Sequence, residues 1–307
     1  MSLKEVKGKI RAVKKINQVT KAMEAVSAVK MRRSQATAIE ARPFALHAIG
    51  LLRRLVRRGE VKEHALVAPR EKVNTALVVV ITSDRGLAGS LNGYVLKTAH
   101  KLIAKEGWTK EQVAILAIGK KGYEHFEKRG FRIVDHLDHW GENVAVGNPD
   151  ELARKIIADY KEQTYDKVMV VYSNFESTFI QQPVVRQLLP VAFETLEEVI
   201  EGIVPERGKY SELRDAARKE VKNEYLFEPT PRAVFDELLP YLIGVVLYHA
   251  VLEANASEHS ARMVAMKSAS DRSRDIARDL TLAYNKARQS SITAEVSEIT
   301  SGIEAMR

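Results

Sequence analysis

Apolar residues near both ends of the chain recur every three or four positions over unusually long stretches. Residues 2–58 contain only one proline and two glycines, and residues 231–301 contain only one glycine and one proline after the first position. An ordinary globular core does not use helical patterns of this length. At about 1.5 Å per residue, either segment forms a helix on the order of 80 Å long. The sequence therefore predicts a long helix at each end of the chain.

The N-terminal helix has a start signal and an apolar face. Ser2 and Glu5 have the spacing of a capping box, in which each side chain binds the other residue's backbone N–H. Apolar residues then follow at spacings of three and four. The residues predicted to face a partner helix are Val6, Ile10, Val13, Ile16, Val19, Met23 and Val26.

The C-terminal helix carries a narrow stripe made largely of small residues. One seven-residue series is Leu252, His259, Met266, Ser273, Leu280, Ala287 and Ala294, and its companion is Ala256, Met263, Ser270, Ala277, Tyr284 and Ser291. Small side chains let two helix axes approach to about 8 Å. We therefore expect the terminal helices to form a slim coiled coil. The alternative is that both helices simply pack on a globular core.

Between the long helices the pattern changes to alternating short strands and helices, which is typical of a layered α/β domain. Five strands are predicted, at Ala76–Ser83, Val113–Gly119, Phe131–Leu137, Lys167–Phe175 and Pro183–Val191. Helices are expected at about Ser90–Lys105, Tyr123–Arg129 and Asn148–Lys161. The predicted fold class is α+β or α/β, with a Rossmann-like domain inserted between the helices of a long antiparallel coiled coil.

These patterns divide the chain into four parts: an N-terminal coiled-coil helix (1–58), a Rossmann-like domain (73–194), a charged surface excursion (195–228) and a C-terminal coiled-coil helix (229–307). The excursion is poor in apolar periodicity, and one short helix is expected in it, around Ser211–Lys219. The most apolar stretch, Leu238–Ala256, is interrupted by proline and polar residues, which argues against a membrane span.

Charge is distributed unevenly along the chain. The net charge is +8, yet residues 1–58 hold fifteen Lys or Arg against three Glu, so the remainder is slightly acidic. A basic segment of this kind suits nucleic acid, an anionic membrane or an acidic protein, and charge alone does not choose among them. The absence of cysteine excludes disulfides, thiolate nucleophiles and cysteine-ligated metals.

Residues Ile81–Gly89 follow a predicted strand and precede a helix, which is where α/β folds place ligands. The loop contains neither the dinucleotide fingerprint nor the phosphate-loop motif, and Asp84 disfavours a bound anion. A tight turn fixed by Asp84 and Arg85 is the favoured interpretation. His136 and His139 lack a third ligand, and the carboxylates of the last helix have the spacing of solvated ion pairs. No catalytic residue, cofactor site or metal site is predicted.

Three stretches together resemble the gamma subunit of F-type rotary ATP synthases, in its bacterial form. They are Ile16–Met31 in the first helix, Ile81–Gly89 in the central domain, and Ala256–Ser270 with Tyr284–Gly302 in the last helix. The chain departs from the family pattern at Ala88, Asp271–Ser273 and Gly302–Ile303. With no cysteine, it cannot carry the dithiol switch of chloroplast relatives.

The resemblance implies a central shaft that couples proton flow through a membrane rotor to ATP synthesis or hydrolysis, without nucleotide chemistry of its own. The implied partners are the alpha and beta subunits, the epsilon subunit and the membrane ring of c subunits, at the cytoplasmic face of the bacterial plasma membrane. Neither a nucleic acid nor a small-molecule ligand is expected. The positions that match family contacts with beta subunits are Met23, Lys30, Arg33, Arg288, Gln289, Thr293, Glu295 and Glu298.

Two other functions compete with this interpretation. A nucleic-acid-binding protein would use the basic first helix, although that helix lacks interleaved aromatic residues and a known docking motif. A dinucleotide-dependent enzyme is disfavoured by the missing glycine fingerprint.

Overall fold

The computed structural model describes residues 2–57, 64–140, 147–191 and 228–306. Their contacts divide the chain into two compact units. The helical unit comprises Met1–Ala28 and Arg262–Arg307, and the sheet unit comprises Val29–Ala261. The units cut across both long helices, whereas the sequence suggested a division at the helix ends.

Both predicted long helices are present. Helix α1 spans Leu3–Arg57 and helix α7 spans Pro231–Ala305. The predicted capping box is confirmed, because the Ser2 N–H donates to Glu5 Oε2 at 3.0 Å and the Glu5 N–H donates to Ser2 Oγ at 3.3 Å. These two bonds satisfy backbone donors that the first helical turn leaves without intrahelical partners.

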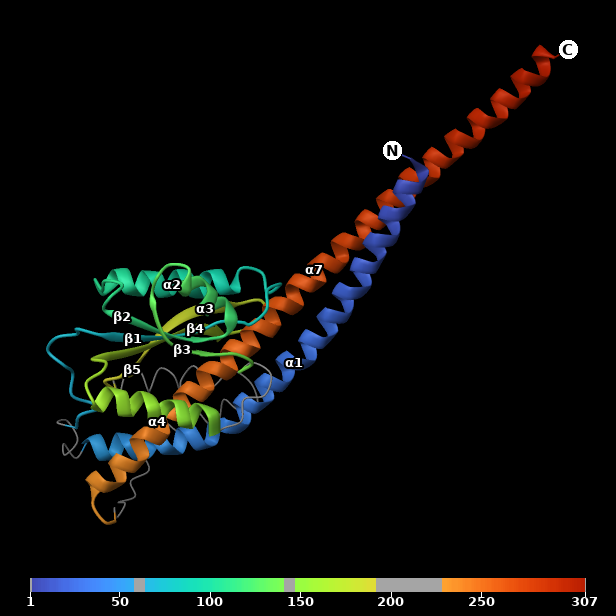
Figure 1. Cartoon of the computed structure of the whole chain (residues 1–307). Helices are drawn as coiled ribbons and strands as arrows, with labels where there is room; N and C mark the ends of the chain where they lie inside the picture. The colour runs from blue at the N-terminus through green and yellow to red at the C-terminus, as the bar shows by residue number, and fades with distance from the viewer. Residues whose placement is uncertain (1, 58–63, 141–146, 192–227, 307) are drawn as a thin grey trace. The chain divides into compact units, whose positions relative to one another are not determined.

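Within the helical unit, α1 and α7 run antiparallel and side by side, and α7 continues past the start of α1 (Figure 1). The order of contacts agrees with this direction. Asn17 meets Ser270, whereas the earlier residue Lys14 lines a groove with the later residue Thr281. The expected antiparallel pairing of the two terminal helices is confirmed for this unit.

The sheet unit is built around five strands in the order β3-β2-β1-β4-β5. The strands are β1 (Ala76–Ile81), β2 (Val113–Ile118), β3 (Arg132–Leu137), β4 (Lys167–Phe175) and β5 (Gln181–Leu189). The first four are parallel, and β5 pairs antiparallel with β4 at the sheet edge. This edge position tolerates Pro183 inside a strand, because an edge residue needs no second ladder bond.

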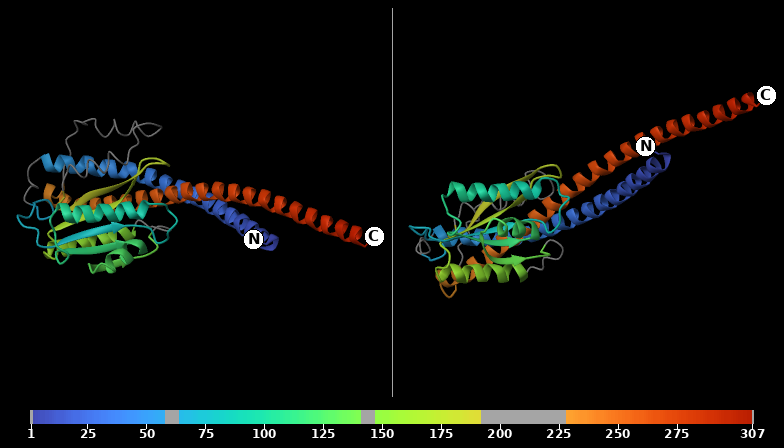
Figure 2. Two further views of the ribbon diagram at one scale, coloured as in Figure 1. Left: turned by 90° about the horizontal axis from the view of Figure 1, so that it is seen from above. Right: turned by 45° about the horizontal axis from the view of Figure 1, so that its top comes forward.

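Helices cover both faces of the sheet. Helices α2 (Leu91–Lys105) and α3 (Lys120–Glu127) lie on one face, and α4 (Gly147–Lys161) lies on the other (Figure 2). Strand β1 supplies both apolar layers by alternation. Val78 and Val80 pack with α2, whereas Val79 and Ile81 pack with α4.

The early part of α7 belongs to the core of the sheet unit. Phe235, Leu239, Leu242 and Leu247 are fully buried in the apolar layer that includes α4. Among the described residues, one helix segment, Arg232–Ile303, is apolar and long enough to cross a membrane by length and composition alone, and 61% of its apolar window is buried inside the structure. Burial against the sheet accounts for that apolar character. The packing of a terminal helix on the globular core, weighed above as an alternative, therefore holds for this part of α7.

The predicted strands and helices are present with small shifts at their ends. Helix α3 begins at Lys120, three residues before its predicted start, and β5 spans Gln181–Leu189 where Pro183–Val191 was predicted. The charged excursion at 195–228 lies almost entirely in residues 192–227, outside the described residues, as does the short helix expected around Ser211–Lys219.

Candidate functional site

The surface of the helical unit is determined by which residues of α1 face α7. Within the helical unit, the buried and half-buried positions of α1 include two interleaved seven-residue series, to which Val6, Ile10, Val13, Asn17, Thr20 and Ser27 belong. The first three are apolar and the last three are polar. This is the seam of a coiled coil, in which two interleaved positions of each heptad contact the partner helix.

The prediction for the second half of the α1 seam was wrong. Ile16, Val19 and Val26, which were expected to face the partner helix, are 52%, 58% and 55% exposed. The prediction followed apolar residues wherever they occurred, whereas the seam keeps its period and accepts Asn17 and Thr20. The apolar residues are thereby turned outward.

Asn17 is the polar centre of this seam. Its Nδ2 donates to the Ser270 carbonyl oxygen at 2.6 Å and lies 3.1 Å from Ser270 Oγ. The Thr20 hydroxyl donates a hydrogen bond to the Ile16 carbonyl of its own helix at 2.9 Å. A single polar residue at a seam position specifies helix register at some cost in stability. The pairing of α1 and α7 is therefore defined by hydrogen bonds as well as by apolar packing.

The small-residue stripe of α7 is confirmed over part of its length. Met266, Ser270, Ser273 and Ala277 are buried, in the order that the two heptad series predict. Further along, Ala287 and Ala294 belong to the same series but are exposed.

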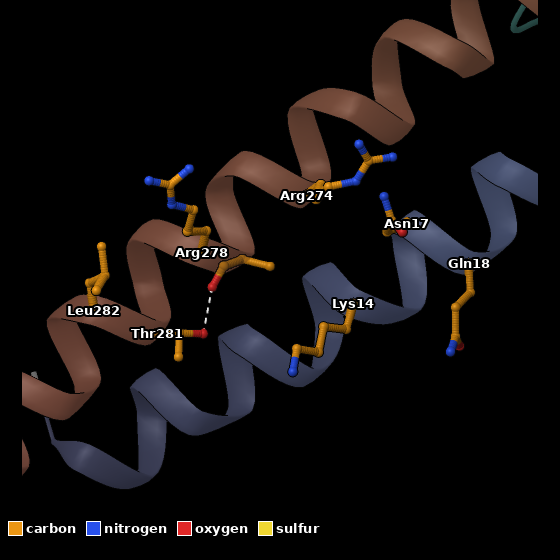
Figure 3. Close-up of a pocket in the computed structure, with 8 residues that line it drawn as sticks. Lys14, Asn17, Gln18, Arg274, Arg278, Thr281 and Leu282 are labelled. Carbon is orange, nitrogen blue, oxygen red and sulfur yellow. Dashed lines mark hydrogen bonds between the residues drawn. The ribbon is translucent and has the colours of Figure 1, made fainter.

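A groove of about 450 Å³ lies along the two helices in the helical unit (Figure 3). It is lined by Lys14, Asn17, Gln18, Arg274, Ala277, Arg278, Thr281 and Leu282. Lys14 comes from α1, and two guanidinium groups come from successive turns of α7. Arg274 Nη2 lies 3.3 Å from Asp271 Oδ1, which offsets part of this positive charge. The charged side chains that line the groove are all cationic.

The predicted contact residues on α1 differ in exposure. Met23 is half-buried and lies in the helical unit. Lys30, also half-buried, and Arg33, which is exposed, lie in the part of α1 that belongs to the sheet unit. Met23 therefore shares the helical unit with the exposed residues Ile16, Val19 and Val26. The four are spaced three, four and three residues apart, so they form one stripe along α1.

The predicted contact residues on α7 are all exposed: Arg288, Gln289, Thr293, Glu295 and Glu298. Arg288 and Glu295, which are seven residues apart, lie on one side of α7. Gln289 and Thr293, which are four residues apart, lie on another side. Thr293 Oγ1 donates to the Gln289 carbonyl at 2.9 Å, and Glu295 Oε1 accepts from Ser291 Oγ at 3.3 Å.

The last turns of α7 carry an apolar stripe of their own. Ile292, Val296, Ile299 and Ile303 are each more than half exposed, and their spacing of four, three and four places them on one side of the helix. Isolated surface apolar residues are common, but a stripe of four marks a contact surface.

In the sheet unit, side chains of the loop after β1 accept hydrogen bonds from other segments, which confirms the structural role expected for Asp84. Asp84 Oδ1 accepts from the Lys120 N–H at 3.1 Å, and Asp84 Oδ2 accepts from the His139 N–H at 3.0 Å. Thr82 Oγ1 accepts from the Gly122 N–H at 2.7 Å. An anion at the start of α3 would compete with these groups for the same backbone donors.

Gly119 completes this arrangement. Its φ of 93° lies in the region that favours glycine, and a Cβ there would come within 2.0 Å of the Thr82 carbonyl oxygen. The close approach brings the start of α3 against the end of β1.

Two part-buried histidines, one on α2 and one on α3, pair in the sheet unit. His100 Nε2 and His125 Nε2 lie 2.9 Å apart, and Arg129 Nη1 lies 3.2 Å from His125 Nδ1. Burial, followed by the charge of Arg129, lowers the pKa of His125 to about 4 and also lowers the pKa of His100. Among the described residues, no group of three or more possible metal ligands is found.

Comparison with known proteins gives the family. The family model described as ATP synthase matches residues 2–306. The ATP synthase gamma chain of Chlorobaculum tepidum is 38% identical over 309 residues, covering 100% of this chain and 99% of the relative. That of a Roseiflexus species is 39% identical over 306 residues, covering 99% of this chain and 98% of the relative.

Solved structures show the same fold at lower identity. A chain of the Euglena gracilis mitochondrial ATP synthase, in an OSCP/F1/c-ring structure of rotational state 3, matches with a TM-score of 0.63 and 18% identity, covering 99% of this chain and 94% of that chain. A chain of the Tetrahymena thermophila mitochondrial central stalk and c-ring matches with a TM-score of 0.59 and 22% identity, covering 82% and 99%.

The full-length match to the family model, the full-length similarity to gamma chains and the paired terminal helices agree. The chain belongs to the gamma chain family of F-type ATP synthases, the family of central rotor shafts.

Proposed function

We propose that the helical unit is the part of the shaft that turns inside a ring of alpha and beta subunits, and that its exposed stripes are the surfaces they contact. The observation that carries this proposal is the outward orientation of Ile16, Val19 and Val26 beside Met23. Apolar residues exposed in a row on a coiled coil are typical of a surface that another protein covers.

Coupling follows from the asymmetry of this surface. One side of α1 presents apolar residues, whereas the groove beside Lys14, Arg274 and Arg278 presents positive charge. A surrounding subunit therefore has a different contact free energy at each angle of the shaft. A rotor shifts the equilibria of its neighbours only through such differences.

The remaining parts of the proposal extend the family assignment. We propose that the sheet unit contacts the c ring and the epsilon subunit, and that the subunit contributes no catalytic residue to the ATPase complex. The complex would translocate protons and lie at the cytoplasmic face of a bacterial plasma membrane. The absence of a catalytic role is supported by the loop at Asp84. Its carboxylate accepts the backbone N–H groups at the position where an α/β fold usually binds a nucleotide.

Reconstitution tests the proposal directly. The purified chain should show no ATPase activity, and mixing it with alpha and beta subunits should restore coupled hydrolysis. Failure of alpha and beta subunits to retain the chain in a pull-down would refute the proposal that the shaft turns inside their ring.

Cross-linking tests the contact surface. A cysteine introduced at Met23 should cross-link to a cysteine in a beta-subunit loop in a nucleotide-dependent way, and the natural absence of cysteine keeps the reaction specific. Thr20→Cys is the matched control, because Thr20 lies one turn away but is only 9% exposed in the seam. Equal cross-linking at both positions would show that the predicted orientation of α1 is wrong.

The two competing functions are checked in the same preparation. A nucleic-acid binder would show filter binding near physiological ionic strength with a steep salt dependence. A dinucleotide-dependent enzyme would show a ligand-induced thermal shift with NAD or ATP.

A further inference from the structure

Two buried serines of α7 bond to the sheet unit rather than to their own helix. Ser257 Oγ donates to the Ser173 carbonyl in β4 at 2.9 Å, and Ser260 Oγ donates to the Thr178 carbonyl in the β4–β5 turn at 2.7 Å. Both serines are 0% exposed. They lie three residues apart, so they project from the same side of α7.

Other hydroxyls of α7 behave differently. Ser268, Ser273 and Thr281 each donate to the carbonyl four residues earlier in the helix, at 3.1, 2.6 and 2.6 Å. This is the usual fate of a hydroxyl inside a helix. Ser257 and Ser260 are therefore distinguished by their partners, and not by residue type.

The carbonyl that Ser257 reaches lies where the strand ladder lacks donors. Ser173 lies opposite Pro183 of β5, and because the nitrogen of a proline in an edge strand faces away from the neighbouring strand, this pair makes no ladder hydrogen bond and the Ser173 carbonyl faces the β1 side. On that side of β4, pairing with β1 ends at Val171. A buried carbonyl without a donor destabilises a fold. The Ser257 hydroxyl supplies the donor that this carbonyl would otherwise lack.

A second contact strengthens the same joint one turn earlier. Glu253 of α7 and Arg186 of β5 both interact with the Tyr172 hydroxyl, and burial followed by the Glu253 carboxylate raises the pKa of Tyr172 well above its ordinary value. Glu253 lies four residues before Ser257, on the same side of α7. Three positions over two turns thus connect one side of the helix to β4 and to the β4–β5 turn.

We propose that Ser257 and Ser260 are positioning residues that hold α7 rotationally against the sheet unit, so that torque passes between the sheet and the helix at this joint. The inference rests on the proposed shaft function. Ser260 stands just before the end of the sheet unit at Ala261, where α7 continues into the helical unit. Directional hydrogen bonds resist twisting of the helix about its axis, which apolar packing, being non-directional, resists less.

The test uses the full chain assembled with alpha and beta subunits, comparing Ser257→Ala/Ser260→Ala with the matched control Ser268→Ala. A single cysteine is introduced at exposed Lys97 in the sheet unit or at exposed Lys286 in the helical unit, and carries a rotation probe. The measured quantity is the width of the probe's angular distribution during the pauses of ATP-driven rotation.

The double variant should widen the distribution for the probe at Lys97 and leave that at Lys286 unchanged. It should also accelerate amide exchange in the β4–β5 turn by roughly 2- to 10-fold, as expected from the loss of one ordinary hydrogen bond. Unchanged width at Lys97, or equal widening at both sites, would overturn the inference. ATP-driven rotation in every sample confirms the shaft function separately, so the two failures are distinguishable.

Discussion

Asn17→Ala tests whether hydrogen bonding in the seam holds the two terminal helices together. The substitution removes the side-chain amide that donates to Ser270 and leaves the backbone of α1 compatible with a helix, because alanine has the highest helix propensity. It changes no exposed apolar residue. Any change in the stability of α1 can therefore be attributed to the lost hydrogen bonds in the seam.

The structure sets the size of the expected effect. Nδ2 contacts both the carbonyl and the hydroxyl oxygen of Ser270, at 2.6 and 3.1 Å, and Asn17 is half-buried. Each hydrogen bond contributes about 0.5–1.5 kcal/mol net, and partial exposure favours the lower half of that range. Loss of both contacts should lower the free energy of opening of α1 by about 1–2 kcal/mol, equivalent to roughly 5- to 30-fold faster amide exchange.

Hydrogen exchange of the full chain measures this directly, since local opening is resolved without assuming that the whole molecule unfolds at once. Gln18→Ala is the matched control, because Gln18 is the adjacent residue and is exposed. The seam argument fails if amides within a turn of Asn17 exchange no faster in Asn17→Ala than in Gln18→Ala.

Three further predictions concern the sheet unit. Gly119→Ala should lower the melting temperature strongly or prevent folding, because its Cβ would lie 2.0 Å from a backbone oxygen at a φ of 93°. Leu242→Ala should destabilise by about 2–5 kcal/mol, measured from the denaturant midpoint by tryptophan fluorescence, because the side chain is fully buried in the core. Since the pKa of His125 falls from 6.5 to about 4 on folding, its neutral form stabilises the fold above pH 6.5, and that contribution should decline as the pH falls toward 4. In His125→Gln the pH dependence of stability over this range should be shallower, and an unchanged slope would exclude the His100–His125 pair as its source.

Several features of the fold could be predicted because local physics and tertiary structure agree. The capping box at Ser2 and Glu5, the strand Lys167–Phe175 and the small-residue stripe of α7 each follow from residue type and spacing. The structural role of Asp84 was predictable from its place after a strand, but its partners were not, because the N–H groups of Lys120 and His139 are 36 and 55 residues away in sequence.

The outer face of α1 could not be predicted by counting apolar residues. Ile16 and Val19 have the residue type of a seam, and Asn17 and Thr20 have the residue type of a surface, yet their positions are reversed. Two interleaved seven-residue series, one starting from Val6 and one from Ile10, identify the true seam and would have shown the exposed stripe. The joint at Ser257 and Ser260 gave no such signal, because its partners are backbone carbonyls some 80 residues away in sequence.

The exposed stripe at the end of α7 affects how the cell must handle this polypeptide before assembly. A single helix without tertiary partners has marginal stability in water. The exposed side chains of Ile292, Val296, Ile299 and Ile303 also make this helix prone to aggregate. Surplus copies should therefore become substrates for chaperones and proteases. A shortage of ring subunits would then appear first as low abundance of the shaft, and production of both would have to be balanced.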